Sequence, residues 1–125
     1  MEKYSISQVA AKYGLEPHTL RFYEKEGIIH PQRTAGGVRF YTREDTARLE
    51  MALCLKNTGM TLKDIRRYFQ LVAQGDDTLE QRLKIFEAHL ERVRQEISRM
   101  EENLVVISGK IDKTRQAIAA REAKN

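Results

Sequence analysis

The chain has 125 residues, of which 41% are hydrophobic and 32% are charged, and its formal net charge is +4. This length fits one domain, or one domain with an extension, and the high charged fraction is typical of long exposed helices. The lone cysteine excludes an internal disulfide and a multi-cysteine metal site within the chain. No apolar run approaches the length of a membrane span, and the N-terminus does not resemble a signal peptide. We therefore expect a cytoplasmic protein with no cofactor and no membrane partner.

Positive charge is concentrated in the first part of the chain. Residues 1–75 carry 12 lysines and arginines against 8 acidic residues, whereas residues 76–125 carry 10 of each. Such an excess favours an anionic partner, and nucleic acid is the commonest one.

Two short helices are predicted within residues 4–29. Ser5 is a good N-cap for the first helix, because its hydroxyl can accept a hydrogen bond from a first-turn N–H. Gly14 ends that helix, and Pro17 suits the first turn of the second, which stops at Gly27. Two helices joined by a tight turn with a glycine form a helix-turn-helix.

The second of these helices carries a stripe that is basic and aromatic. His18, Arg21, Phe22 and Lys25 follow the spacing i, i+3, i+4 and i+7, which places them on one side of the helix. Arginine can fork to guanine or to phosphate, and lysine binds phosphate as a point charge. The stripe therefore favours a DNA-recognition helix; the alternative is a solvated face with a stray phenylalanine.

Residues 30–42 are predicted to form a β-hairpin. Pro31 breaks the preceding helix, and Gly36 with Gly37 marks a turn between two short extended runs. The hairpin contains Arg33 and Arg39 and no acidic residue. A basic hairpin after a helix-turn-helix is typical of a wing that grips phosphates, and the alternative is an ordinary surface hairpin.

Two further helices are predicted within residues 42–75. Thr42 and Thr61 are their N-caps, and Gly59 and Gly75 lie at their ends. The first of them is apolar nearly all round near its C-terminal end, where Cys54 lies, so we expect that end to be buried.

Three runs carry a resemblance to a known family: TLRFYEKEGII, the hairpin GGVRFY and KNTGMTLKDIRRYF. In order and spacing they resemble the MerR family of winged-helix transcription regulators, over roughly residues 4–75. The resemblance implies DNA contacts from Arg21, Tyr23, Arg39 and Tyr41, with Thr19 and Arg33 as weaker matches. His18 and Phe22 are added by the stripe alone, and Phe22 stands where many relatives have tyrosine.

A heptad repeat is predicted from residue 79 onward. Apolar residues recur in alternating steps of three and four over about 40 residues, with Thr114 as the exception. The series is Leu79, Leu83, Phe86, Leu90, Val93, Ile97, Met100, Leu104, Ile107, Ile111 and Ile118. A helix of roughly 60 Å cannot bury such a seam on a small domain, so we expect a coiled coil with a second copy.

The predicted architecture is therefore mainly α: a winged helix-turn-helix DNA-binding domain over residues 1–75 and a coiled-coil dimerisation helix over residues 76–125. A two-fold dimer implies a palindromic site in double-stranded promoter DNA. The resemblance implies that the DNA between the −35 and −10 elements is held bent and untwisted, so that RNA polymerase reads both elements.

Two hypotheses remain for the signal that controls the protein. Residues 54–65, CLKNTGMTLKDI, resemble the single-cysteine subfamily of aldehyde- and nitrosative-stress regulators, which implies that covalent modification of Cys54 switches the promoter on. Alternatively, Cys54 is a small core residue and the protein bends DNA constitutively or responds to another effector. An enzyme is not expected, because the sequence shows no carboxylate pair, catalytic triad or phosphate loop.

Overall fold

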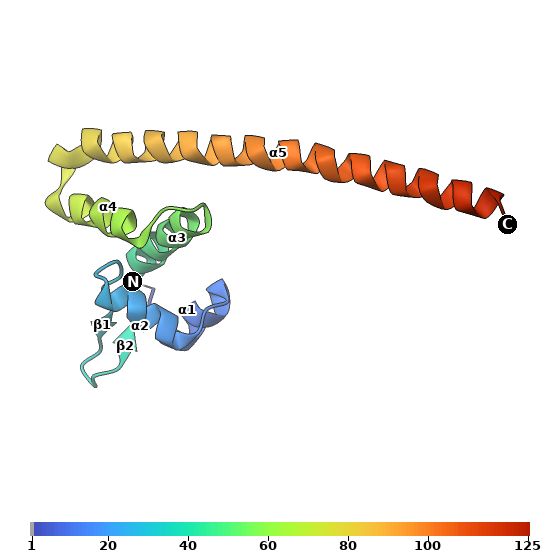
Figure 1. Cartoon of the computed structure of the whole chain (residues 1–125). Coiled ribbons are helices and arrows are strands. Elements are labelled where there is room, and N and C mark those ends of the chain that lie inside the picture. The colour runs from blue at the N-terminus through green and yellow to red at the C-terminus, as the bar shows by residue number, and fades with distance from the viewer. Residues whose placement is uncertain (1) are drawn as a thin grey trace. The chain divides into compact units, whose positions relative to one another are not determined.

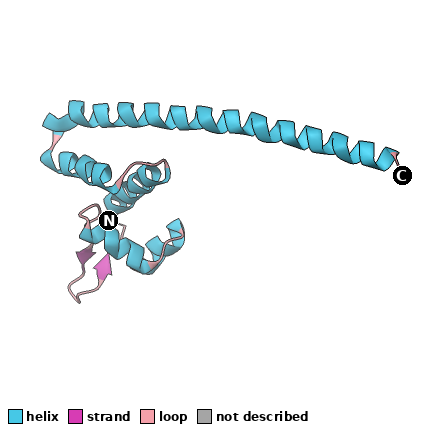
Figure 2. Ribbon diagram, viewed as in Figure 1, coloured by secondary structure: helices cyan, strands magenta, loops and turns pink. Residues whose placement is uncertain are grey.

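Helices dominate the computed structural model, which describes residues 2–125 (Figure 1). The elements, in chain order, are α1 (Ile6–Tyr13), α2 (Pro17–Lys25), β1 (Gln32–Arg33), β2 (Arg39–Phe40), α3 (Arg43–Asn57), α4 (Leu62–Gln74), a 3-10 turn η1 (Asp76–Thr78) and α5 (Leu79–Ala123). Within residues 2–125, β1 and β2 are the strands, which Figure 2 draws in magenta. The predicted fold class, mainly helical with a long C-terminal helix, is confirmed.

Local sequence signals place the first two helices as predicted. Ser5 caps α1 and forms a capping box with Gln8, so two first-turn N–H groups are satisfied reciprocally. Gly14 follows α1 with a φ of 64°, a left-handed conformation that glycine adopts without a Cβ clash. Pro17 then occupies the first turn of α2, where its missing N–H costs nothing.

The hairpin of residues 30–42, called the wing below, is a two-stranded antiparallel ladder. Gln32 lies opposite Phe40, and Arg33 lies opposite Arg39. The next residue after β2, Tyr41, pairs with Tyr4. The N–H of Tyr41 donates a hydrogen bond of 2.7 Å to the Tyr4 carbonyl, and the N–H of Tyr4 donates one of 2.9 Å to the Tyr41 carbonyl. The segment before α1 is therefore tied to the base of the wing.

One apolar core holds the helix-turn-helix, the wing and α3–α4 together. Its largest fully buried side chains are those of Leu20, Tyr23, Ile28, Ile29, Tyr41, Leu49 and Ile65. Each leucine or isoleucine among them contributes about 1.5–3 kcal/mol when its side chain is fully removed from water. The orientation of α2 is set by Leu20 and Tyr23, so the opposite side of this helix is left facing outward.

Helix α3 begins in a capping box formed by Thr42 and Asp45. Asp45 is buried, and its carboxylate also accepts a hydrogen bond of 2.9 Å from the backbone N–H of His30, which joins α3 to the segment before the wing. The prediction that the C-terminal end of this helix is buried all round is wrong in part. Leu55 faces the core, but Met51 and Cys54 are exposed, because the packed side of α3 covers only one stripe.

By its contacts the chain divides into a first unit that ends at Ile85 and a second unit, Phe86–Asn125. Helix α5 has 45 residues, and at a rise of about 1.5 Å per residue it is about 65 Å long. The predicted domain border at residue 75 stays a prediction. None of the helices within residues 2–125 is long and apolar enough to cross a membrane.

Candidate nucleic-acid interface

The outward side of α2 presents the predicted stripe. The side chains of His18, Arg21, Phe22 and Lys25 are all exposed, whereas Leu20 and Tyr23 on the other side are 0% and 2% exposed. Thr19 is half-buried at the edge of the stripe. These four exposed residues are called the recognition stripe below, and their charge and orientation suit the major groove of DNA.

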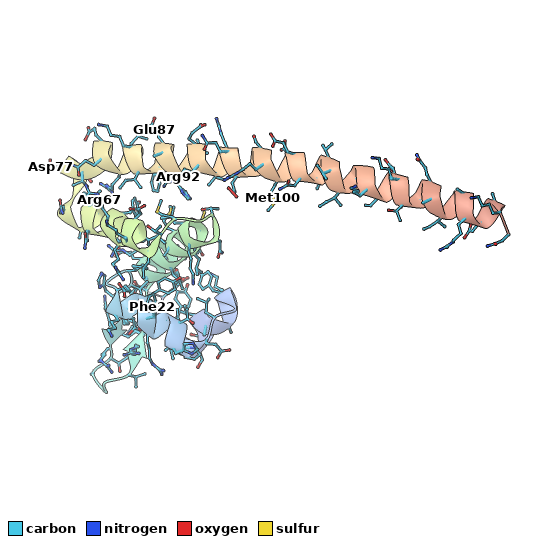
Figure 3. All side chains as sticks on the ribbon, viewed as in Figure 1. Phe22, Arg67, Asp77, Glu87, Arg92 and Met100 are labelled. Carbon is cyan, nitrogen blue, oxygen red and sulfur yellow. The ribbon has the colours of Figure 1, made fainter. Side chains whose placement is uncertain are left out.

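Phe22 is an apolar side chain within this otherwise polar stripe. It is 42% exposed, and its ring lies edge-on against the ring of Tyr23 with 5.7 Å between the centroids. Figure 3 labels Phe22 on α2. Phe22 therefore places apolar surface among the basic groups of the stripe, with one edge of its ring packed against the buried Tyr23.

The wing presents its two arginines in different ways. Nη1 of Arg33 donates a hydrogen bond of 2.9 Å to the carbonyl oxygen of Gly37, and Arg33 is exposed. Arg39 is only 28% exposed at its side chain, and its Nη2 lies 3.5 Å from Oε2 of Glu24 on α2. The wing is thus joined to the recognition helix by an ion pair.

Two predicted DNA-contact residues, Tyr23 and Tyr41, are placed in the core at 2% and 1% exposure. The Tyr41 hydroxyl donates a hydrogen bond to the Glu24 carboxylate. Burial, followed by this bond, raises the pKa of Tyr41, so the phenol stays neutral and remains a donor. Direct contact of the two tyrosines with DNA stays a prediction; what the structure gives them is a packing role beside the recognition stripe.

Sequence reasoning missed Glu24 as a member of the site. In sequence it is an acidic residue between Phe22 and Lys25 of the recognition stripe, and the helical pattern indicates no partner for it. The sequence does show that Glu24 lies four residues after Leu20 and so close to the apolar side of the helix. A carboxylate that is partly buried there requires a hydrogen-bond donor or a positive charge as a partner. Its neighbour Glu26 is also paired, with Arg66 of α4, which ties the end of the helix-turn-helix to α4.

Cys54, the candidate sensor, is exposed near the C-terminal end of α3. The backbone carbonyl of Cys54 accepts hydrogen bonds from the N–H of Thr58 at 3.1 Å and from its hydroxyl at 2.7 Å, which fixes the last turn of the helix. The neighbouring Met51 is 37% exposed. The thiol is therefore accessible to a small reagent in the single chain.

Helix α5 carries the candidate dimerisation residues as an apolar stripe, called the seam below. Val93 and Phe86 are half-buried, and most other members are 46–66% exposed. Those exposed members are Leu79, Leu83, Leu90, Ile97, Met100, Leu104, Ile107 and Ile111. Figure 3 labels Met100 on this helix. Stripes of this size and length are uncommon on a free surface.

The described residues offer no cluster of three or more histidine, cysteine, aspartate or glutamate side chains suited to a metal ion.

Comparisons with known proteins agree on one family. A model described as the MerR HTH family regulatory protein matches residues 4–71, and one described as MerR, DNA binding, matches residues 46–110. An HTH-type transcriptional regulator of Haemophilus influenzae is 43% identical over 95 residues, which cover 75% of this chain and 70% of that protein. The regulator AdhR of Bacillus subtilis is 37% identical over 71% of this chain and 64% of its own length.

A solved structure is similar along nearly the whole chain. The crystal structure of HiNmlR, described as a MerR family regulator lacking the sensor domain and bound to promoter DNA, has a TM-score of 0.86 and 38% identity, and the match covers 94% of each chain. A MerR family regulator from Bacillus thuringiensis has a TM-score of 0.81 and 38% identity, with 90% of this chain and 99% of that chain covered.

Proposed function

The chain belongs to the MerR family of helix-turn-helix transcriptional regulators, and on that premise we propose that it binds promoter DNA with the recognition stripe and the wing. The observation that carries this proposal is the exposed basic and aromatic side of α2, with its apolar side locked in the core by Leu20 and Tyr23. A solved relative with this fold is bound to promoter DNA.

Within this interface the roles divide by position. The N-terminal and central residues of α2, His18, Thr19 and Arg21, suit base edges or nearby phosphates, and Arg33 and Arg39 of the wing suit phosphates beside the groove. Phe22 supplies apolar surface for a base or a thymine methyl group. The buried Tyr23 and Tyr41 support these side chains from behind.

The seam of α5 supports a homodimer. An apolar stripe at heptad spacing on a helix of 45 residues needs a second helix to cover it, and another copy of the chain is the simplest source. The dimer binds a palindromic site through residues 1–75 of each copy, while residues 76–125 hold the copies together. By analogy with the family, it distorts the DNA between the −35 and −10 elements so that RNA polymerase engages both.

Cys54 is the proposed sensor. Support comes from the exposure of the thiol-bearing residue in the single chain and from the resemblance of residues 54–65 to the aldehyde- and nitrosative-stress regulators. A covalent adduct on the sulfur switches the bound promoter on.

The DNA-binding proposal is tested by fluorescence anisotropy with duplex DNA at several salt concentrations. If Arg21 forks to a base, Arg21→Ala costs about 1–3 kcal/mol on a selected site and less on mixed-sequence DNA. The matched control is Arg121→Ala, which removes one positive charge near the end of α5. Equal affinity of Arg21→Ala and wild type for both duplexes contradicts the assignment of the recognition stripe.

A further inference from the structure

Glu24 is an acidic side chain held inside an otherwise basic interface. It lies on α2 between Phe22 and Lys25 in sequence, its side chain is 14% exposed, and it contacts two residues of the wing. Oε1 accepts a hydrogen bond from the Tyr41 hydroxyl, and Oε2 lies 3.5 Å from Nη2 of Arg39. The carboxylate thus joins the recognition helix to the wing strand and to the residue that follows it.

A negative charge in this place opposes DNA binding when it is considered alone. The carboxylate repels phosphates, so its removal by itself strengthens the attraction between the protein and DNA. Arg39, however, is a rotamer-rich side chain, and ordering it at an interface costs affinity. A fixed carboxylate beside the guanidinium holds it in one place and leaves its other N–H groups available to a phosphate.

The anchor of Glu24 is itself rigid. Tyr41 is 1% exposed, and its backbone is bonded to Tyr4 in both directions. The hydroxyl that holds Oε1 of Glu24 is therefore fixed by the core and by the base of the wing. Tyr41 thus holds the Glu24 carboxylate in place, and Glu24 in turn holds the Arg39 guanidinium.

From this arrangement, and resting on the proposed function, we propose that Glu24 is a positioning residue for DNA binding. It sets the wing against the recognition helix and orients Arg39 toward a phosphate, and this effect outweighs its repulsion of DNA. Glu24 thus favours DNA binding although it is acidic. Its replacement by a neutral residue is expected to weaken DNA binding, whereas charge alone predicts stronger binding.

The test uses the full chain and a mixed-sequence DNA duplex, because a phosphate contact does not depend on sequence. Glu24→Gln keeps the size and an acceptor for Tyr41 but removes the charge that faces Arg39. We expect it to weaken binding by about two- to fivefold, the factor that corresponds to one partly exposed ion pair, and to reduce the salt slope by up to about one. The matched control is Glu16→Gln, at the N-cap of α2, where the side chain makes no capping hydrogen bond; we expect equal or tighter binding.

A double-mutant cycle locates the effect. If Glu24 acts through Arg39, Glu24→Gln has no weakening effect in an Arg39→Ala background. A role confined to folding stability predicts a lowered melting temperature with an unchanged salt slope. Should Glu24→Gln not fold, as judged by circular dichroism, Tyr41→Phe replaces it: this variant removes the anchor without changing the charge, and it too is expected to bind DNA more weakly.

The outcomes separate the two proposals. A wild-type chain without measurable affinity for DNA overturns both. Wild-type binding together with unchanged or tighter binding by Glu24→Gln, or by Tyr41→Phe in its place, overturns the positioning role and leaves the proposed function standing. A weakening that persists in full in the Arg39→Ala background also overturns it.

Discussion

Arg33 and Arg39 lie directly opposite each other across the wing, so two positive side chains share one position of a two-stranded ladder. Like charges directly opposite each other on two strands destabilise a hairpin. Two contacts moderate the repulsion: Arg39 pairs with Glu24, and Arg33 donates to the carbonyl of Gly37. A DNA phosphate placed between the two arginines would reduce the repulsion further.

The variant Arg33→Gln tests this use of the wing. The change removes one charge of the pair, so we expect weaker binding to all DNA sequences and a salt slope reduced by about one. Fluorescence anisotropy at several salt concentrations measures both quantities. Discrimination between selected and mixed-sequence DNA should remain as in wild type; a loss confined to the selected site contradicts a phosphate contact.

The stability of the first unit is expected to depend on Tyr13 at alkaline pH. Its hydroxyl donates a hydrogen bond of 2.6 Å to Glu50 of α3, and burial, followed by this bond, raises the pKa of Tyr13 from 10.0 to about 12. The folded chain therefore holds this proton more tightly than the unfolded chain. The resulting stability is complete below pH 10 and is lost as the pH rises toward 12.

Denaturant titrations between these pH values check the expectation. Tyr13→Phe should show a smaller fall in the free energy of unfolding than wild type, and Glu50→Gln should be intermediate because burial of the phenol remains. An identical fall in Tyr13→Phe and wild type shows that the Tyr13 proton has no part in the pH dependence.

Dimerisation through the seam is tested by adding charge to it. Ile97→Asp with Leu104→Asp places two carboxylates where the second helix is expected, and neither has a partner to offset its desolvation. Sedimentation should give a monomer for this variant and a dimer for wild type at micromolar concentration. The matched control, Ser98→Asp with Val105→Asp, adds the same charge one residue beyond each seam position and should stay dimeric. A monomeric wild type refutes the coiled coil.

The sensor proposal predicts a separation of binding from switching. Cys54→Ser changes one exposed atom, so DNA affinity should equal that of wild type, whereas induction by an aldehyde or a nitrosating agent should be lost. Transcription from a bound promoter in vitro is the readout. A normal response in Cys54→Ser removes the sensor role and favours the constitutive or differently controlled regulator.

Much of the fold follows from short-range signals that a sequence displays directly. The caps at Ser5, Thr42 and Thr61 and the stop at Gly14 are confirmed, because each depends on one residue and its immediate neighbours. The outward direction of the recognition stripe was also predictable from helical spacing. What remained hidden are the partnerships between distant segments.

Glu24 illustrates that limit, because its contacts with Arg39 and Tyr41 depend on how the wing packs against α2. The family resemblance implied a DNA contact for Tyr41, which stays a prediction, but no local pattern indicated that packing places its side chain in the core. The same holds for Cys54, which a run of apolar residues placed inside and which the single packed side of α3 leaves exposed. Side-chain direction in such runs is fixed by tertiary contacts that no local pattern encodes.

We propose that a dimer of this chain reads a palindromic DNA site through α2 and the wing. The most direct test of this proposal is a hydroxyl-radical footprint on duplexes that the wild-type protein enriches from a random-sequence pool. We predict two protected half-sites related by two-fold symmetry, with centres one helical turn or a multiple of it apart, and weaker protection by Ile97→Asp with Leu104→Asp. No enriched sequence, or a single asymmetric footprint that the seam variant leaves unchanged, contradicts the account.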